Sequence, residues 1–207
     1  VGTPILTSMM PTDIQNDCGY NISLGGLTLA CRENNHYLVA NNQRREIESL
    51  FGQTVQLEVN KAGEGTDISQ SFYIPQQFKF GAPTPVFDEI NIGTTITWNT
   101  DPLNTQDLIM ILDYMPTNHV MYAYDVDMEY EQPIIDANPN RISYAKMIPD
   151  VGSYTFASEE LAPFNENMVL KLWLIRGTHR LIQGETTNDI IAFAAYTNQN
   201  HFFRYKL

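Results

Sequence analysis

Apolar and polar residues alternate with a period of two along most of the chain, and helical periodicity is almost absent. In residues 54–60 the odd positions are apolar and the even positions polar, which predicts a strand with one buried face. Gly63-Glu64-Gly65 predicts a turn, and residues 69–74 the returning strand. Near Ile22 the parity of the apolar positions flips at Gly25-Gly26, which predicts a β-bulge.

Two short helices interrupt this pattern. Ile47, Leu50 and Phe51 have helical spacing and are followed by Gly52, a residue typical of helix ends. Residues 158–161 begin with a serine that suits a helix N-cap, continue with two acids and precede Pro163. We expect one or two single-turn helices in an otherwise β-rich chain.

Residues 81–85 (Gly-Ala-Pro-Thr-Pro) would interrupt any strand ladder, so they predict a linker. We therefore predict an N-terminal β-sandwich-like domain at 1–80, a linker at 81–90 and a second domain at 91–207. The fold class predicted is all-β, with two small β-sandwich domains of which the second is immunoglobulin-like.

The second domain shows about seven strand signals separated by turn residues, as an immunoglobulin-like sandwich requires. Residues 108–112 are continuously apolar and predict a central strand buried on both faces. Trp98 and Trp173 are expected to pack the core. The further strands are expected at 92–98, 120–131, 154–156, 168–175, 189–196 and 201–207.

The composition excludes several classes. Apolar residues make up 43% of the chain, enough for a core, and no stretch approaches the ~18 apolar residues of a membrane span. The net charge of −12 and the scattered basic residues argue against a nucleic-acid partner. The two cysteines, Cys18 and Cys31, are expected to form a disulfide if the chain is exported; two buried free thiols are the alternative.

Four carboxylates recur at alternate positions of the predicted strand 120–131, which would place them in a row on one face. Such a row favours a solvated outer face whose charge blocks edge pairing. Its alternative is a Ca²⁺ site completed by loop carbonyls, because Ca²⁺ takes six to eight oxygen ligands. The residues are Asp125, Asp127, Glu129 and Glu131.

A polar loop at 99–107 lies at the end of a predicted strand, where sandwich folds commonly bind ligands. Its side chains, flanked by two aromatic residues, would offer hydrogen bonds and a stacking surface to a sugar. Ordinary turn chemistry is the favoured explanation, because Asn, Asp and Pro are the residues that turns need. The candidate ligand-binding residues are Trp98, Asn99, Asp101, Asn104, Asp107 and Tyr114.

The chain lacks the motifs of common catalytic and cofactor sites. Its four histidines are dispersed, and it has no His-Glu-x-x-His, Cys-x-x-Cys or Gly-x-Ser-x-Gly sequence. We therefore predict no catalytic residue, no cofactor and no enzymatic activity.

Several segments resemble exported bacterial lipoproteins with tandem sandwich domains, over roughly residues 50 to 180. The resemblance implies an export route and the tandem fold, but no reaction; a lipid anchor, if the protein carries one, would lie before Val1. The segments that carry it are residues 72–75, 96–101, 107–111, 152–156, 161–164 and 172–177.

Together these features predict an exported protein, periplasmic or at the cell surface, that binds or scaffolds without catalysis. The expected partner is a surface glycan or another surface protein, and a membrane contact is expected only if the protein carries a lipid anchor, which this sequence does not contain. The alternative is a carbohydrate-active protein, either a glycan-binding module or a hydrolase.

Overall fold

The computed structural model describes residues 5–9, 19–32, 36–38, 43–61, 65–82, 89–122, 128–185 and 190–207. Strands make up 56% and helices 13%, which confirms the all-β, sandwich-like fold class. Among the described residues, no helix has the length and apolar character needed to cross a membrane.

The elements follow one another as β1 (Ile5–Met9), β2 (Tyr20–Leu24), β3 (Leu27–Thr28), β4 (Ala30–Arg32), β5 (His36–Leu38), α1 (Arg44–Glu48), β6 (Gln53–Lys61), β7 (Gly65–Ile74), β8 (Phe80–Ala82), β9 (Glu89–Ile90), β10 (Thr95–Trp98), β11 (Leu108–Tyr114), α2 (Pro116–Tyr122), α3 (Met128–Ala137), β12 (Ile142–Ile148), β13 (Ser153–Thr155), α4 (Ser158–Leu161), β14 (Val169–Gln183) and β15 (Ile190–Tyr205).

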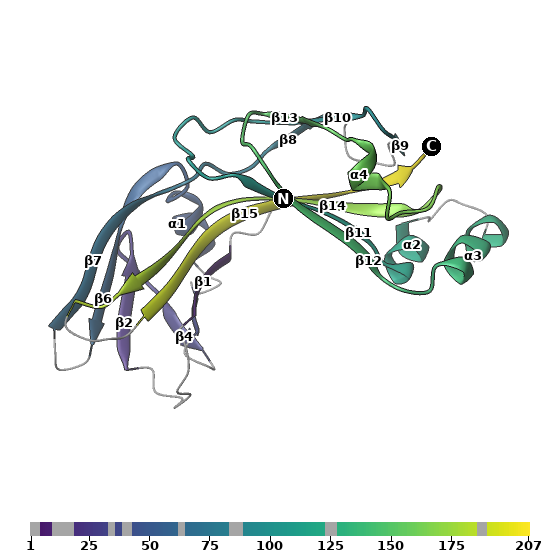
Figure 1. The fold of residues 1–207 in the computed structure, drawn as a ribbon. Helices are drawn as coiled ribbons and strands as arrows, with labels where there is room; N and C mark the ends of the chain where they lie inside the picture. The colour runs from purple at the N-terminus through teal and green to yellow at the C-terminus, as the bar shows by residue number, and fades with distance from the viewer. Residues whose placement is uncertain are drawn as a thin grey trace.

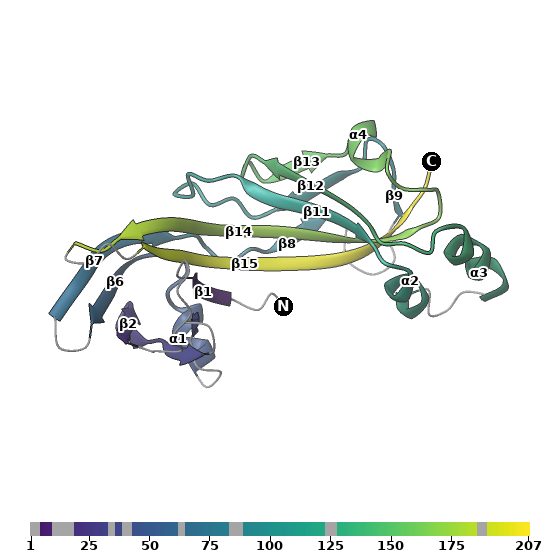
Figure 2. The ribbon, with the colours of Figure 1, turned by 60° about the horizontal axis from the view of Figure 1, so that its bottom comes forward.

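A long antiparallel hairpin, β14 and β15, forms the middle of the molecule (Figure 1). It belongs to a sheet ordered β12-β11-β14-β15-β1-β5-β4, with β9 also paired to β15. Five of these strands can be followed from top to bottom in Figure 2, from β12 to β1. Two smaller sheets, β13-β10-β8 and β3-β2-β6-β7, pack with the ends of the long hairpin.

Two apolar cores result, and the hairpin contributes to both. The core beside β8, β10 and β13 includes Leu170, Leu172 and Leu174 of β14. The core beside β2, β6 and β7 contains Ile182 of β14 and Phe193 of β15, whose ring centroid lies 4.4 Å from that of Phe72. The predicted first domain, 1–80, therefore does not contain all the residues of its own core. The boundary itself stays a prediction, because residues 83–88 lie outside the described part of the chain.

The helical segments α1 and α4 confirm the two expected short helices, whereas α2 and α3 correct the strand predicted at 120–131. The period of two around Tyr122 is overridden by tertiary contacts: His119 of α2 and Glu131 of α3 are both fully buried against β14 and β15. Local sequence also argues against α3, because Pro133 lies inside it.

Two smaller predictions are also corrected. Gly25 and Gly26, both with positive φ (55° and 83°), form the two-residue turn of the β2–β3 hairpin rather than a bulge, because Leu24 pairs directly with Leu27. Strand β11 is central, as predicted, between β12 and β14. Its second face is only partly buried: Asp113 is buried there, whereas Ile109 is 40% exposed.

Candidate ligand-binding hollow

The residues of the loop predicted to bind a ligand are mostly used inside the protein. Asp101 is buried and accepts hydrogen bonds from the Tyr73 hydroxyl, at 3.0 Å, and from the backbone N–H groups of Gln76 and Leu103. Together with burial, this carboxylate raises the pKa of Tyr73 to about 12. The Asn99 amide bonds to the backbone of residues 77 and 79.

A buried charge pair lies beneath this loop. The Arg176 guanidinium and the Asp150 carboxylate are 2.7 Å apart and almost fully buried. Asp150 also accepts hydrogen bonds from the Trp98 indole (2.9 Å) and the Asn104 amide (2.8 Å), and Arg176 donates to the Asn99 carbonyl. We call these two charged residues the Arg176–Asp150 pair; it fastens the loop to β14.

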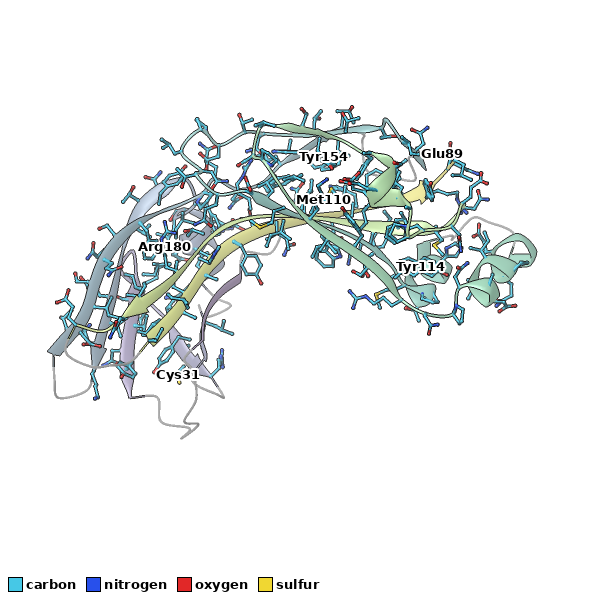
Figure 3. The ribbon with its side chains drawn as sticks, viewed as in Figure 1. Cys31, Glu89, Met110, Tyr114, Tyr154 and Arg180 are labelled. Carbon is cyan, nitrogen blue, oxygen red and sulfur yellow. The ribbon has the colours of Figure 1, made fainter. Side chains whose placement is uncertain are left out.

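The two remaining candidates lie apart. Tyr114 is buried at the other end of β11, where its hydroxyl donates to the Asn138 carbonyl; Figure 3 shows it beside α2. Asp107 is exposed. The loop has the contacts of a structural turn, which is the alternative that its sequence left open.

Of the four carboxylates in the acidic row, only the Glu131 side chain lies in the described part of the chain. Asp125 and Asp127 lie outside the described residues, and the side chain of Glu129 is likewise not described. Glu131 is fully buried, bonds to His119 and forms an ion pair of 2.8 Å with Arg204. Within the described part of the chain, no group of three or more His, Cys, Asp or Glu side chains could hold a metal. Cys31 is disulfide-bonded, whereas Cys18 lies outside the described residues, so their pairing stays a prediction.

A surface hollow of about 590 Å³ lies on the large sheet and was not among the sequence-based predictions. Odd positions of β14 and even positions of β15 face it, because alternate residues of a strand point to the same side. The opposite face of the same strands carries Leu172, Leu174 and Phe203 into the core. The hollow is lined by Ile109, Ile111, Arg141, Trp173, Ile175, Gly177, Thr178, His179, Ala194, Tyr196 and Asn198.

Small residues open the hollow. Gly177 pairs with Tyr196, and a Cβ at position 177 would lie 2.5 Å from the Tyr196 Cβ and 2.5 Å from the Ala195 carbonyl oxygen. Such a contact is impossible without moving β15, so only glycine lets Tyr196 pack this close. Ala194 leaves further space opposite His179. The result is a mainly apolar lining with a few polar groups.

Charged residues lie beside one end of the hollow. Arg141, 61% exposed, holds the Asp113 carboxylate through two hydrogen bonds of 2.7 and 3.0 Å, which raise the pKa of Arg141. On the neighbouring strand, the Lys171 ammonium lies 3.8 Å from the centre of the Trp173 ring and 5.4 Å from that of Phe202. Burial lowers the pKa of Lys171, while the Asp113 charge opposes this.

A signal for this face is present in the sequence. In residues 169–175 both parities are apolar, with Trp173 and Ile175 on one and Leu170, Leu172 and Leu174 on the other. Such a strand is buried on both faces or leaves one apolar face open. The sequence cannot distinguish these outcomes, because nothing local specifies which segment covers the second face.

No family model, curated protein or solved structure was found to match this chain.

Proposed function

We propose that this protein is a non-catalytic binding protein and that it holds a ligand with an apolar surface in the hollow. The observation that carries the proposal is the hollow itself: its volume of about 590 Å³ is typical of ligand pockets, as is a mainly apolar lining with a few polar groups. A folded protein seldom leaves such a face uncovered without a use for it.

The chemistry of the lining favours binding over hydrolysis. A glycosidase needs two carboxyl groups on either side of the scissile bond. Among the described residues that line the hollow there is no Asp or Glu. The nearby Asp113 is buried and is held by Arg141. The polar lining groups Arg141, His179 and Asn198 can orient a ligand by hydrogen bonds.

A glycan is the alternative ligand, and one observation favours it. Trp173 and Tyr196 both line the hollow, and aromatic side chains can provide a stacking surface with a polar edge. The mainly apolar floor, with Ile109, Ile111 and Ile175, favours a less polar molecule.

We further propose that the protein works outside the cytoplasm, in the periplasm or at the cell surface. Disulfides persist in oxidising compartments, so the bonded state of Cys31 supports export. The resemblance to exported lipoproteins implies the same location. On the same grounds we propose another surface protein as a second candidate partner.

The test uses the two tryptophans. Trp98 is buried in the core and Trp173 lines the hollow, so a Trp98→Phe variant leaves one fluorescent reporter at the site. We expect the neutral dye Nile red to bind, with a blue shift of its emission and energy transfer from Trp173, and a glycan array to give no signal.

Two variants locate the binding. Ile109→Glu places a charge in the hollow and should weaken dye binding by about tenfold, because the carboxylate must be desolvated. Val151→Glu makes the same change at an apolar residue that is 68% exposed and lies outside the lining, so it should have no effect. The absence of dye binding, or equal effects of both variants, would refute the proposal.

A further inference from the structure

The open face of the large sheet changes in character along β14. At one end Lys171 pairs across the strands with Asp113 and Phe202. Trp173 and Ile175 follow, opposite Ile111 and Ile109, and then come the glycine and small residues of the hollow. The face therefore runs from a charged end to an apolar floor.

The apolar character continues beyond the hollow. Met147 pairs with Ile109 on the outer side and is 59% exposed, while Leu181 pairs with Ala192 further along the hairpin and is 79% exposed. From Lys171 to Gly177 the strand advances by about 20 Å, at ~3.3 Å per residue. This length suits an extended chain better than a compact ring.

The charged end carries a net positive charge. Arg141 and Asp113 neutralise each other through their paired hydrogen bonds. Lys171 forms no hydrogen bond or ion pair with any described residue; its ammonium lies over the Trp173 ring and near Phe202. An ammonium has three donors and is favoured by an anionic partner, so this one is available to a ligand.

On these grounds we propose that the ligand is a single long apolar chain with one anionic head group, as in a fatty acid, its head group at Lys171 and its chain along the hollow. This inference rests on the function proposed above and adds the ligand class to it. The half-buried Lys171 ammonium, which has no anionic hydrogen-bond partner among the described residues, complements the anionic head, and Ile109, Ile111 and Ile175 contact the chain. The volume of the hollow suits one such chain.

The experiment compares two ligands that differ only in the head group. Hexadecanoate and hexadecanol, both below the concentrations at which they aggregate, are titrated against the Trp98→Phe protein, with displacement of Nile red as the readout. We expect hexadecanoate to bind at least about tenfold more tightly than hexadecanol, because only the carboxylate forms a charge-assisted hydrogen bond with Lys171.

Lys171→Gln should remove this preference and leave the affinity for hexadecanol within about twofold. The matched control is Lys79→Gln, since Lys79 is exposed and lies outside the lining; it should retain the preference. Circular dichroism checks that both variants fold.

The outcomes separate the two proposals. Equal binding of the acid and the alcohol overturns the anionic head group and leaves the apolar hollow standing. Binding of Nile red with neither long-chain ligand overturns the chain. If the protein co-sediments with phosphatidylglycerol vesicles as tightly as it binds hexadecanoate, the single free chain is overturned in favour of a membrane lipid. Failure of every apolar probe overturns the proposed function itself.

Discussion

Gly177 determines the depth of the hollow, because it allows Tyr196 to approach the backbone of β14. In Gly177→Ala the added methyl group would overlap the Ala195 carbonyl, so β15 must shift locally. We expect a loss of about 1–3 kcal/mol in the free energy of unfolding, as in other overpacked sites, and weaker dye binding. Urea titration measures the first effect and Nile red the second. An unchanged midpoint would show that the strands tolerate the methyl group.

His119 links the helical segment to the sheet in its neutral form. Its Nδ1 accepts a hydrogen bond from the Val169 N–H at 3.1 Å, which leaves Nε2 to donate to Glu131. Burial lowers the pKa of His119 below the ordinary value of 6.5, and Arg204 adds to this, although Glu131 opposes it. Protonation of the folded state would break the Val169 bond.

The lowered pKa of His119 determines how the stability of the protein depends on pH. The unfolded state binds a proton at His119 more readily, so this contribution is complete above about pH 6.5 and is lost as the pH falls through the lower pKa of the folded state. We expect the urea midpoint to fall between about pH 7.5 and about pH 5, and His119→Leu to reduce that slope. His201, whose pKa burial also lowers, should account for part of the remaining slope. An identical slope in the variant would contradict the assignment.

The two tryptophans show how far the burial of a single residue can be predicted from the sequence. Both were expected in the core, and Trp98 is there, with its ring 6.0 Å from that of Phe78. Trp173 is instead half-buried on the open face. Hydrophobicity predicts that a residue favours burial, but which face of a strand is covered depends on distant segments.

At the scale of elements, hairpins of nearby residues were predictable and long-range pairing was not. Strands β6 and β7 form at the alternating segments that predicted them, although the turn expected at Gly63-Glu64-Gly65 falls largely on residues 62–64, outside the described part of the chain. The segment around Tyr122 also alternates, yet α2 and α3 form there, because the contacts of His119 and Glu131 outweigh local preference. Alternation of apolar and polar residues over one short segment is therefore weak evidence for a strand where buried ionisable side chains make the tertiary contacts.

The Arg176–Asp150 pair joins elements that lie far apart in the sequence, and its removal is a test of how the polar loop is held. Arg176→Met leaves the Asp150 carboxylate buried without its ion pair, so we expect a loss of about 3–5 kcal/mol in the free energy of unfolding. Arg180→Met is the control, because Arg180 is exposed on the same strand and should change stability by less than about 0.5 kcal/mol. Denaturant titration of both variants provides the measurement. If the Arg176→Met and Arg180→Met variants have similar free energies of unfolding, the Arg176–Asp150 pair contributes nothing to stability.

The whole molecule is organised by the long hairpin, which no local pattern reveals. The sequence predicts strands within residues 168–175 and 189–196, but not that they extend to fifteen and sixteen residues and reach two separate cores. The proline-containing segment at 81–85 predicts a boundary between two bodies. In the structure, Ile182, Ile191, Phe193 and Ala195 complete the core on the N-terminal side of that segment.

This architecture predicts how the two halves behave when the chain is cut. Limited proteolysis is expected to cleave near residues 81–90, since the sequence there is typical of a linker. The nicked halves should stay together, because separation would expose the apolar side chains that β14 and β15 contribute to the N-terminal core. Size-exclusion chromatography should show one peak with both fragments, which separate only in denaturant.

For the same reason a fragment of residues 1–82 alone should show no cooperative unfolding, and adding residues 76–207 should restore it. Two independently folded fragments would show that each half holds its own core and would refute the role given to the hairpin.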